Sequence, residues 1–396
     1  MAPVVPGALG GPWGRARSAF SVTARPGDGS RARAGRLVTR NSTLETPIVM
    51  PVGPNAPGKA LDPDDLRAIG APIILSNTYH LALRPGHERI ERLGGLHRFM
   101  GWERAILTDS GGFQVVSLAA QRSIDEGGAT FRSHLDGTVH RFTPEHAIRV
   151  QEALGSDIAV CFDQPVLPHA SSRAEVREAT DRTHRWAERC LAAHRRPDQA
   201  LFGIIQGGLE ADLRVASAET LAALPFDGLC IGGLAGDETA EQRRAALDVT
   251  VPLLADDPRP RYLMGLGSPL DIIEAVDAGV DMFDSVLPAR VARNATLWVP
   301  DGRMNMRNTR WQDDDAPVQE GCRCRLCRSF SRAYLAHLFR ANELLAYRLA
   351  TCHNLTFLLD FMAGIRSAIA DGTFPQLLRT MRDLRPGTTG ASAIAS

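Results

Sequence analysis

The 396-residue sequence has little of several features that define common protein classes. It carries no net charge, with 45 basic and 45 acidic residues, so no overall electrostatic field points to a nucleic-acid partner. Lys59 is the only lysine, and arginine supplies the remaining positive charge. No uninterrupted apolar stretch approaches the roughly 20 residues of a bilayer-spanning helix. We therefore expect a protein that does not span a membrane and that binds any polyanion through a local basic cluster.

Cysteine is also scarce, and the seven cysteines do not form the pattern of a disulfide framework. Cys161, Cys190 and Cys230 stand alone in apolar surroundings, as core residues do. An odd total without a secretory signal predicts a reducing, cytoplasmic location. Residues 1–18 are rich in Gly, Pro, Ala and Arg and lack acidic residues, which predicts a disordered extension. A transit peptide is the alternative, although no cleavage signature is visible.

Short apolar runs alternate with amphipathic segments over most of the chain. An early hairpin is predicted from Phe20–Ala24 and Gly35–Thr39. The predicted strands of the main sheet are Pro47–Met50, Ile73–Leu75, Ala105–Leu107, Ile158–Phe162, Leu201–Ile205, Gly228–Ile231, Tyr262–Met264 and Met282–Phe283. The predicted helices are Pro144–Leu154, Ser172–His194, Asp212–Leu224, Glu241–Leu254 and Pro269–Ala278. This alternation predicts a parallel sheet, and about eight units favour a closed (β/α)8 TIM barrel over an open doubly wound sheet.

Polar or glycine residues follow most of the predicted strands. Because the carboxyl ends of barrel strands converge on one mouth, where barrel active sites lie, these residues are candidates for a shared site. A single one could be a helix cap or a turn residue, but a succession of them favours a site. The set comprises Asp109, Asp163, Gln206, Gly232-Gly233, Met264-Gly265 and Asp284.

A second constellation lies near the end of the chain. Cys322, Cys324 and Cys327 place three thiolates within six residues, and His353 follows after a predicted helix from Ser329 to about Leu349. Three thiolates and one imidazole complete a tetrahedral Zn²⁺ site and leave no open position, which predicts a structural zinc. Cys352 is the alternative fourth ligand. We expect a zinc-binding subdomain at 313–353, inserted into a barrel formed by 19–312 and 354–385.

Leu107-Thr-Asp-Ser-Gly-Gly-Phe-Gln-Val115 resembles a signature of the tRNA-guanine transglycosylases, also called queuine tRNA-ribosyltransferases. The resemblance extends in order from about Phe20 to about Leu384 and includes the cysteine–histidine set. Its other segments are Ser76-Asn-Thr-Tyr-His-Leu81, Leu83-Arg-Pro-Gly86, Ser133-His-Leu-Asp-Gly137, Phe202-Gly-Ile-Ile-Gln-Gly207, Tyr262-Leu-Met-Gly-Leu-Gly267 and Asp281-Met-Phe-Asp-Ser-Val-Leu-Pro288. It implies exchange of guanine at wobble position 34 of tRNAs with a G-U-N anticodon for a 7-deazaguanine. It also implies a (β/α)8 barrel with an inserted zinc subdomain, and a homodimer.

The resemblance assigns roles to residues of this chain. Asp284 is the expected nucleophile, which forms a covalent bond to the ribose, and Asp109 is the expected proton acceptor and general acid. Double displacement by two carboxylates parallels the retaining glycosidases, and one shared base pocket implies ping-pong kinetics. The expected base-binding residues are Asp109, Ser110, Gly111, Gly112, Phe113, Asp163, Gln206, Gly233, Leu234 and Met264. The expected tRNA-binding residues are Gly265, Leu266, Gly267, Ser268, Pro269, Leu270, Asp271, Ala289, Arg290, Val291, Ala292 and Arg293.

Several positions depart from the bacterial pattern of the family. Gln164-Pro165 replaces Glu-Cys, Ser285 replaces cysteine, and Gly236 replaces a valine. A glycine at 236 leaves room for a base larger than 7-aminomethyl-7-deazaguanine, so queuine is a candidate substrate. Three other functions stay open: a non-catalytic tRNA-binding accessory subunit, an archaeal-type enzyme that acts in the body of tRNA, and a metal-dependent barrel hydrolase. The first should lack catalytic aspartates, the second should carry extra carboxyl-terminal domains, and the third needs an open metal site.

Overall fold

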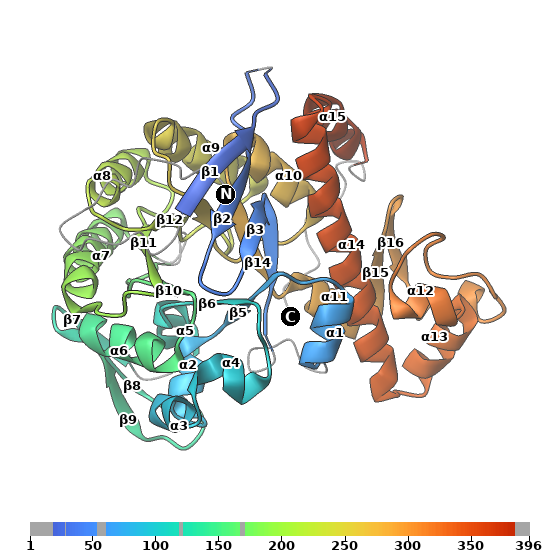
Figure 1. Ribbon diagram of the computed structural model, residues 1–396, viewed down its shortest axis with the longest axis horizontal. Helices are drawn as coiled ribbons and strands as arrows, with labels where there is room; N and C mark the ends of the chain where they lie inside the picture. Colours follow the sequence, from blue (N-terminus) through green and yellow to red (C-terminus); the bar gives the residue numbers. More distant parts are fainter. Residues whose placement is uncertain (1–18, 28, 54–60, 119–121, 167–170, 385–396) are drawn as a thin grey trace, which may run out of the picture.

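The computed structural model describes residues 19–384 except residue 28 and the segments 54–60, 119–121 and 167–170. Its centre is an eight-stranded parallel sheet in the order β4-β14-β13-β12-β11-β10-β6-β5 (Figure 1). The strands are β4 (Ile48–Pro51), β5 (Ile73–Ser76), β6 (Ala105–Thr108), β10 (Ile158–Val160), β11 (Ala200–Ile205), β12 (Gly228–Ile231), β13 (Arg261–Leu263) and β14 (Met282–Ser285). These are the eight strands that the sequence predicts, and no end differs from its predicted position by more than two residues.

The sheet closes on itself between β4 and β5. Val52 and Leu75 form a parallel bridge there, and the Gly53 N–H donates to the Leu75 carbonyl oxygen at 2.6 Å. The remaining parallel neighbours follow the chain order, as the successive βα units of a barrel do. The fold is therefore the (β/α)8 barrel that the sequence predicts.

Helices cover the outside of the barrel and bury one apolar face each (Figure 1). They include α6 (Pro144–Leu154), α7 (Arg173–Ala193), α8 (Ala211–Ala222), α9 (Ala240–Thr250) and α10 (Pro269–Ala278). The bounds of α6 and α10 agree with the prediction because residues typical of helix ends flank both helices. Thr143 and Ser268 cap the amino ends. Gly155 and Gly279 end the helices in the left-handed conformation. The predicted helix to Leu254 ends earlier, since Val251–Leu254 forms a 3-10 turn.

The amino-terminal end of the barrel is covered by a three-stranded antiparallel sheet of β1 (Ala19–Ala24), β2 (Ala34–Val38) and β3 (Thr43–Thr46). The predicted hairpin corresponds to β1 and β2, while β3 was not predicted. Arg33 joins this sheet to the barrel through a buried ion pair with Asp281, with N···O distances of 2.6 and 2.8 Å. Asp281 directly precedes β14, so this contact lies at the end of the barrel opposite the mouth.

A second antiparallel sheet is inserted between β6 and β10, and it was not predicted. Its strands are β7 (Arg122–Asp125), β8 (Gly128–Arg132) and β9 (Val139–Phe142). Helix α7 anchors it, because Trp186 Nε1 and Arg189 both donate to the Glu126 carbonyl oxygen. The short helices α1 (Pro63–Ala68), α2 (Thr78–Leu83), α3 (His87–Arg92), α4 (Gly95–Met100) and α5 (Gly112–Leu118) complete this half of the molecule.

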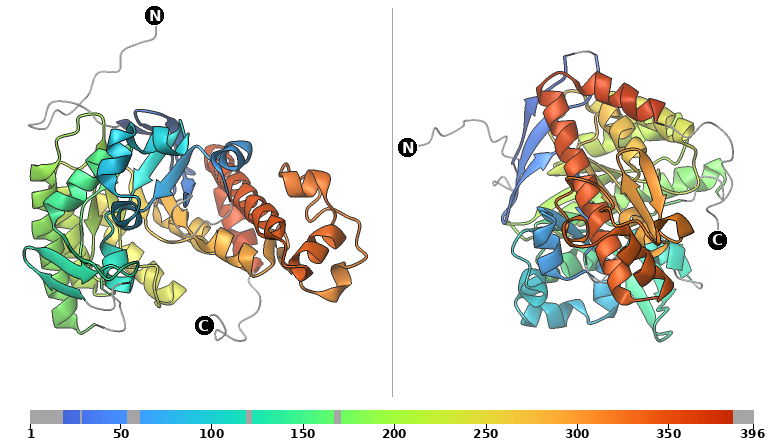
Figure 2. Two further views of the ribbon diagram at one scale, coloured as in Figure 1. Left: turned by 90° about the horizontal axis from the view of Figure 1, so that it is seen from below. Right: turned by 90° about the vertical axis from the view of Figure 1, so that its right-hand side faces the viewer.

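Residues between Ala292 and Ala350 contribute to a separate apolar cluster to one side of the barrel (Figure 2). After α11 (Leu287–Arg293) come β15 (Thr296–Val299), β16 (Gly302–Asn305), a 3-10 turn (Thr309–Trp311), α12 (Arg325–Ser329), α13 (Arg332–Arg340), α14 (Leu344–Ala370) and α15 (Phe374–Asp383). The prediction of one helix over 329–349 is wrong. Asn342 takes a positive φ of 55°, which interrupts the helix between α13 and α14. Helix α14 runs from this cluster back to the barrel and passes through the predicted boundary at 353.

Residues 1–18, predicted as a disordered extension, lie outside the described residues. Within the described part of the chain, no helix combines the length and the apolar character that a membrane crossing requires.

Candidate active site

Three carboxylates lie together at the mouth of the barrel. Asp109 follows β6, Asp163 follows β10, and Asp284 is part of β14. The side chains of Asp109 and Asp163 are buried, with 8% and 6% of their surface exposed, whereas Asp284 is half-buried. The three carboxylates are close enough to interact electrostatically, because the charges of Asp284 and Asp163 both raise the pKa of Asp109.

Asp109 is held by residues that follow the neighbouring strand β5. The Thr78 backbone N–H donates to Oδ1 at 2.9 Å, and the Asn77 side-chain amide donates to Oδ2. Burial raises the pKa of Asp109 to about 7, and these hydrogen bonds oppose only part of that shift. A carboxyl group with this pKa can take up and release a proton near neutral pH, as a general acid and base must.

Asp284 is held by two donors from β13 and the residues after it. The Tyr262 hydroxyl donates to Oδ1 at 2.6 Å and the Gly265 N–H donates to the same oxygen at 2.7 Å. Burial raises the pKa of Asp284, and both hydrogen bonds lower it by stabilising the charged form. The carboxylate is thus fixed in position at the mouth of the barrel.

Asp163 lies deeper in the mouth and is bridged by its two strand neighbours. Ser110 Oγ donates to Oδ1 at 2.9 Å, and Gln206 Nε2 donates to Oδ2 at 2.8 Å. Burial raises the pKa of Asp163 to about 6. Gln206 Oε1 is buried and has no hydrogen-bond partner among the described residues. A buried acceptor without a donor is costly, and the Asp163 carboxylate beside it keeps free lone pairs that suit a ligand with N–H donors.

Glycines shape the same pocket. A Cβ atom on Gly112 would lie 2.6 Å from the Asp163 carbonyl oxygen, so only glycine allows this close approach. Gly111 and Gly233 take positive φ angles of 81° and 72°. Phe113 on α5 is 52% exposed and Met264 is half-buried, while Leu234 is buried. The expected base-binding residues therefore all lie at the carboxyl ends of β6, β10, β11, β12 and β13.

The two segments expected to bind tRNA lie next to Asp284, because they follow the adjacent strands β13 and β14. Gly267 packs so closely against Ser285 that a Cβ atom would overlap its side chain. Ser268 caps α10, and Asp271 forms an ion pair with Arg243 at 2.7 Å. On α11, Arg290 is exposed and Arg293 is half-buried.

The cysteine–histidine group is formed by α12, the turn before it and α14. The Nδ1 atom of His353 lies 3.8, 3.5 and 3.3 Å from the Sγ atoms of Cys322, Cys324 and Cys327. Tetrahedral zinc with ordinary bond lengths would give S···N separations of about 3.6 Å. His353 Nε2 lies 2.8 Å from the Trp298 carbonyl oxygen, which orients the ring so that Nδ1 faces the thiolates. These four residues can hold a metal ion, whereas Cys352 packs in a different apolar cluster.

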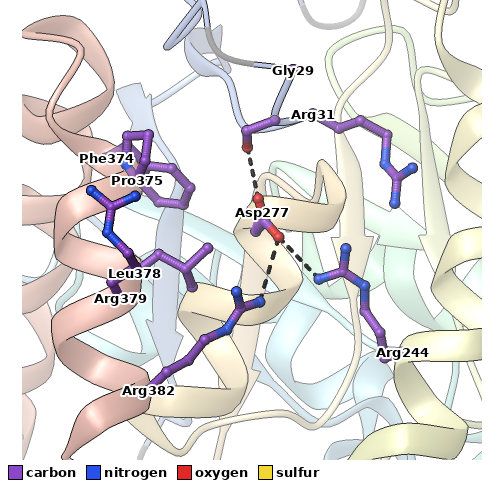
Figure 3. A pocket seen from close by; sticks show the side chains of 10 residues that line it. Gly29, Arg31, Arg244, Asp277, Phe374, Pro375, Leu378, Arg379 and Arg382 are labelled. Carbon is purple, nitrogen blue, oxygen red and sulfur yellow. Dashed lines mark hydrogen bonds and ion pairs between the residues drawn. The ribbon is translucent and has the colours of Figure 1, made fainter.

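A cavity of about 370 Å³ lies at the other end of the barrel, between the start of β2, α10 and α15 (Figure 3). Most of its arginines are already paired. Arg244 and Arg382 flank Asp277 at 3.0 and 3.7 Å, and Arg31 pairs with Asp248. None of the residues that line this cavity belongs to the acidic mouth, so the two are separate.

Sequence reasoning missed three residues of the site. Asn77 and Tyr262 lie within segments that carry the family resemblance, but nothing in a single sequence shows that they bond to the aspartates. Arg214 on α8 is the third, and its 0% exposure shows only in the fold. An arginine among the apolar and small residues of one helix face was the available signal.

Carboxylates at the mouth of a (β/α)8 barrel, with a separate cysteine–histidine subdomain, define the class of the protein as a barrel enzyme. Comparison with known families makes this specific: the model described as queuine tRNA-ribosyltransferase matches residues 28–386, and the chain belongs to this family. It is 55% identical over 348 residues to the queuine tRNA-ribosyltransferase of Symbiobacterium thermophilum, which covers 88% of this chain and 86% of that protein. The relative from Herpetosiphon aurantiacus is 52% identical over 91% of both chains. The relative from Pelotomaculum thermopropionicum is 51% identical over 90% of this chain and 96% of its own length.

Proposed function

We propose that this protein is a tRNA-guanine transglycosylase of queuosine modification, which exchanges guanine at wobble position 34 of G-U-N tRNAs for a 7-deazaguanine. Family membership over most of the chain supports the activity. The observation that carries the mechanism is the pair of Asp109 and Asp284 at one mouth, held by separate donors and electrostatically coupled. The presence of both aspartates in this arrangement argues against a non-catalytic accessory subunit.

In the first displacement, a carboxylate oxygen of Asp284 attacks C1′ of the ribose. The C1′–N9 bond breaks, its electron pair leaves with guanine, and Asp109 gives the departing base a proton. In the second displacement, Asp109 takes the N–H proton of the incoming 7-deazaguanine, whose nitrogen attacks C1′ and releases Asp284. Tyr262 and Gly265 hold Asp284 by Oδ1, so Oδ2 is the oxygen that we assign to the attack.

The base is read by groups that the pocket already orients. Asp163 can accept hydrogen bonds from the ring N–H and the exocyclic amine, since a flipped-out base presents its Watson–Crick edge. Gln206 uses one of its amide N–H groups on Asp163 and keeps a second for the carbonyl oxygen of the base. The Gly233 N–H is the other donor to that oxygen, and Phe113 and Met264 flank the ring. The segments 265–271 and 289–293 would contact the anticodon loop, with Arg290 exposed for a phosphate.

The test of the function is guanine release from labelled tRNA with a G-U-N anticodon, in the presence of each 7-deazaguanine base. Asp284→Asn should abolish release and the denaturation-resistant protein–RNA adduct that forms when no acceptor base is supplied. Asp277→Asn is the matched control, because this carboxylate lies at the opposite end of the barrel. Release that survives in Asp284→Asn would remove Asp284 as the nucleophile.

We further propose that queuine is accepted. Gly236 is exposed after β12, where its N–H donates to Glu238 Oε2 at 2.9 Å. A valine there would narrow the space beside the base. Gly236→Val should therefore reduce turnover of queuine more than that of 7-aminomethyl-7-deazaguanine. An unchanged preference would contradict this assignment.

We assign zinc to the cysteine–histidine group, one ion per chain, in a structural role. Three thiolates and one imidazole leave no open coordination position.

We also propose a cytoplasmic homodimer. All seven cysteines are free, which suits a reducing compartment. The homodimer is what the resemblance to the family implies. Light scattering at micromolar concentration would test the dimer, and a monomer would exclude it.

A further inference from the structure

Helix α8 buries an arginine directly behind the base pocket. Arg214 has no exposed surface, although the rest of this helix face is apolar or small. A buried cation is costly unless its N–H groups are satisfied. The position therefore calls for a specific role, which its contacts indicate.

The Arg214 guanidinium bonds only to backbone carbonyl groups among the described residues. Its Nε donates to the Gly208 carbonyl oxygen at 2.8 Å, and one terminal nitrogen donates to the Gly232 carbonyl oxygen at 2.8 Å. A longer contact of 3.4 Å reaches the Ile205 carbonyl oxygen. The side chain thus joins the carboxyl ends of β11 and β12. Burial lowers the pKa of Arg214 to about 9, so the group remains protonated at neutral pH.

The contact with Gly232 fixes the peptide plane that faces the pocket. In a trans peptide the C=O and the following N–H point in opposite directions. A guanidinium that holds the Gly232 carbonyl oxygen from behind therefore directs the Gly233 N–H to the other side. Gly233 has a φ of 72°, and a Cβ atom there would lie 2.8 Å from Gln206 Oε1 and 3.4 Å from a terminal nitrogen of Arg214, so Gly233 lies between the Arg214 guanidinium and the Gln206 amide. A charged donor on the carbonyl also polarises the peptide and strengthens its N–H as a donor.

Helix α8 positions the second base-reading residue as well. Ser217, one turn after Arg214, accepts a hydrogen bond from the Gln206 backbone N–H at 3.0 Å, and its hydroxyl lies 2.9 Å from His184 Nε2. Both groups assigned to the carbonyl oxygen of the base are thus held by polar side chains of one helix.

We propose that Arg214 is a positioning residue for base recognition: it orients the Gly232–Gly233 peptide so that the Gly233 N–H binds the carbonyl oxygen of the purine-like base. This inference rests on the proposed function. It deepens that function, because it names the residue that positions the N–H group by which the pocket would select a base with a 6-oxo group.

The experiment compares guanine with 6-thioguanine as substrates for incorporation into tRNA. Both bases present the same N–H groups to Asp163, but sulfur is a much weaker acceptor than oxygen. Arg214→Lys keeps a charge but cannot span two strands, because an ammonium is a point donor. In this variant the KM for guanine should rise roughly 10- to 100-fold, as expected for a misplaced hydrogen bond. The KM for tRNA should stay unchanged, and the preference for guanine over 6-thioguanine should fall.

Two further variants make the result decisive. Arg261→Lys is the matched control, because Arg261 is also buried and donates to the backbone carbonyl oxygens of Gly279 and Leu254, but at the opposite end of the barrel. It should lower the melting temperature without changing the base preference. Arg214→Gln removes the buried charge and keeps a donor, so it provides a folded variant if lysine is not tolerated.

An unchanged base preference in a folded Arg214 variant would overturn the proposal, as would an equal loss in Arg261→Lys or a parallel rise in the KM for tRNA. A parent protein that exchanges no guanine would instead refute the proposed function.

Discussion

Replacing Gly112 with alanine would place a methyl group 2.6 Å from the Asp163 carbonyl oxygen and 2.7 Å from its Oδ1. Carbon–oxygen contacts are ordinarily about 3.3 Å or longer, so the two segments must separate by about 0.7 Å. The Asp163 carboxylate cannot move that far and keep its hydrogen bonds of 2.9 Å to Ser110 and 2.8 Å to Gln206. Loss of one hydrogen bond to a charged group costs about 1.5–3 kcal/mol.

That energy corresponds to a rise of roughly 10- to 100-fold in the KM for the base, since about 1.4 kcal/mol is tenfold. The assay is steady-state incorporation of labelled guanine into tRNA, with each substrate varied in turn. The KM for tRNA should change little, because Gly112 contacts Asp163, which we assign to the base, and lies outside the segments that we assign to tRNA. Gly364→Ala is the control: this exposed glycine of α14 has no atom within 4 Å of the added Cβ, and alanine should stabilise the helix by about 0.5–1 kcal/mol. A parental KM for guanine in Gly112→Ala would refute this account of the pocket.

Three further outcomes follow from the same contacts. Burial raises the pKa of Asp109 from 3.8 to about 7. Between these two pH values, Asp109 is protonated in the folded protein but ionised in the unfolded chain. The free energy of unfolding therefore falls as the pH rises through this range. Asp109→Asn should be inactive, because it removes the proposed general acid and base. Its melting temperature should nevertheless exceed that of the parent at pH 8, and this difference should shrink toward pH 4. A difference that stays constant with pH would contradict the assignment. Tyr262→Phe removes a donor from Asp284 and raises its pKa further, so the acidic limb of the kcat profile should move to higher pH, and an unmoved limb would contradict it. Cys324→Ser should lose the zinc measured by elemental analysis and lower the melting temperature, while Cys352→Ser retains the zinc.

The sequence predicted the barrel well because its strands are short, mostly apolar and separated by turn residues. The strand Gly228–Ile231 and the helices Pro144–Leu154 and Pro269–Ala278 have the predicted bounds. The inserted sheet was missed because Arg122–Asp125 is mostly exposed and polar and Val139–Phe142 buries only Phe142, which leaves no apolar pattern to read. The break at Asn342 was missed because the apolar periodicity continues through it, and only a positive φ marks the turn.

The candidate site was predicted in part for a different reason. Strand ends are visible in the sequence, so the sequence alone could assign Asp109, Asp163 and Asp284 to one mouth. Their partners could not be assigned, because each hydrogen bond joins residues that are 19 to 53 positions apart. Knowledge of the strand order supplies this missing step: Asn77 after β5 binds Asp109 after β6, and Tyr262 in β13 binds Asp284 in β14.

The two ends of the barrel use aspartate in opposite ways. At the amino-terminal end, Asp157, Asp227 and Asp281 precede their strands and accept main-chain N–H groups of the neighbouring strand, from Ile106, Leu201 and Arg261 at 2.7–2.9 Å. Although burial raises the pKa of Asp157, its hydrogen bonds to His97 and Ile106 bring it below the usual value, so the charge is stabilised and serves the fold.

At the mouth the balance is reversed. Asp163 is held by side chains and Asp109 and Asp284 by one side chain and one backbone N–H each, and burial raises the pKa of all three. Carboxylates that the fold leaves less well stabilised are the ones that can exchange a proton, bond to a sugar carbon or accept a base. In this protein, the aspartates that bond to the neighbouring strand precede their strands, whereas the aspartates to which we assign chemical roles lie at the carboxyl ends of theirs.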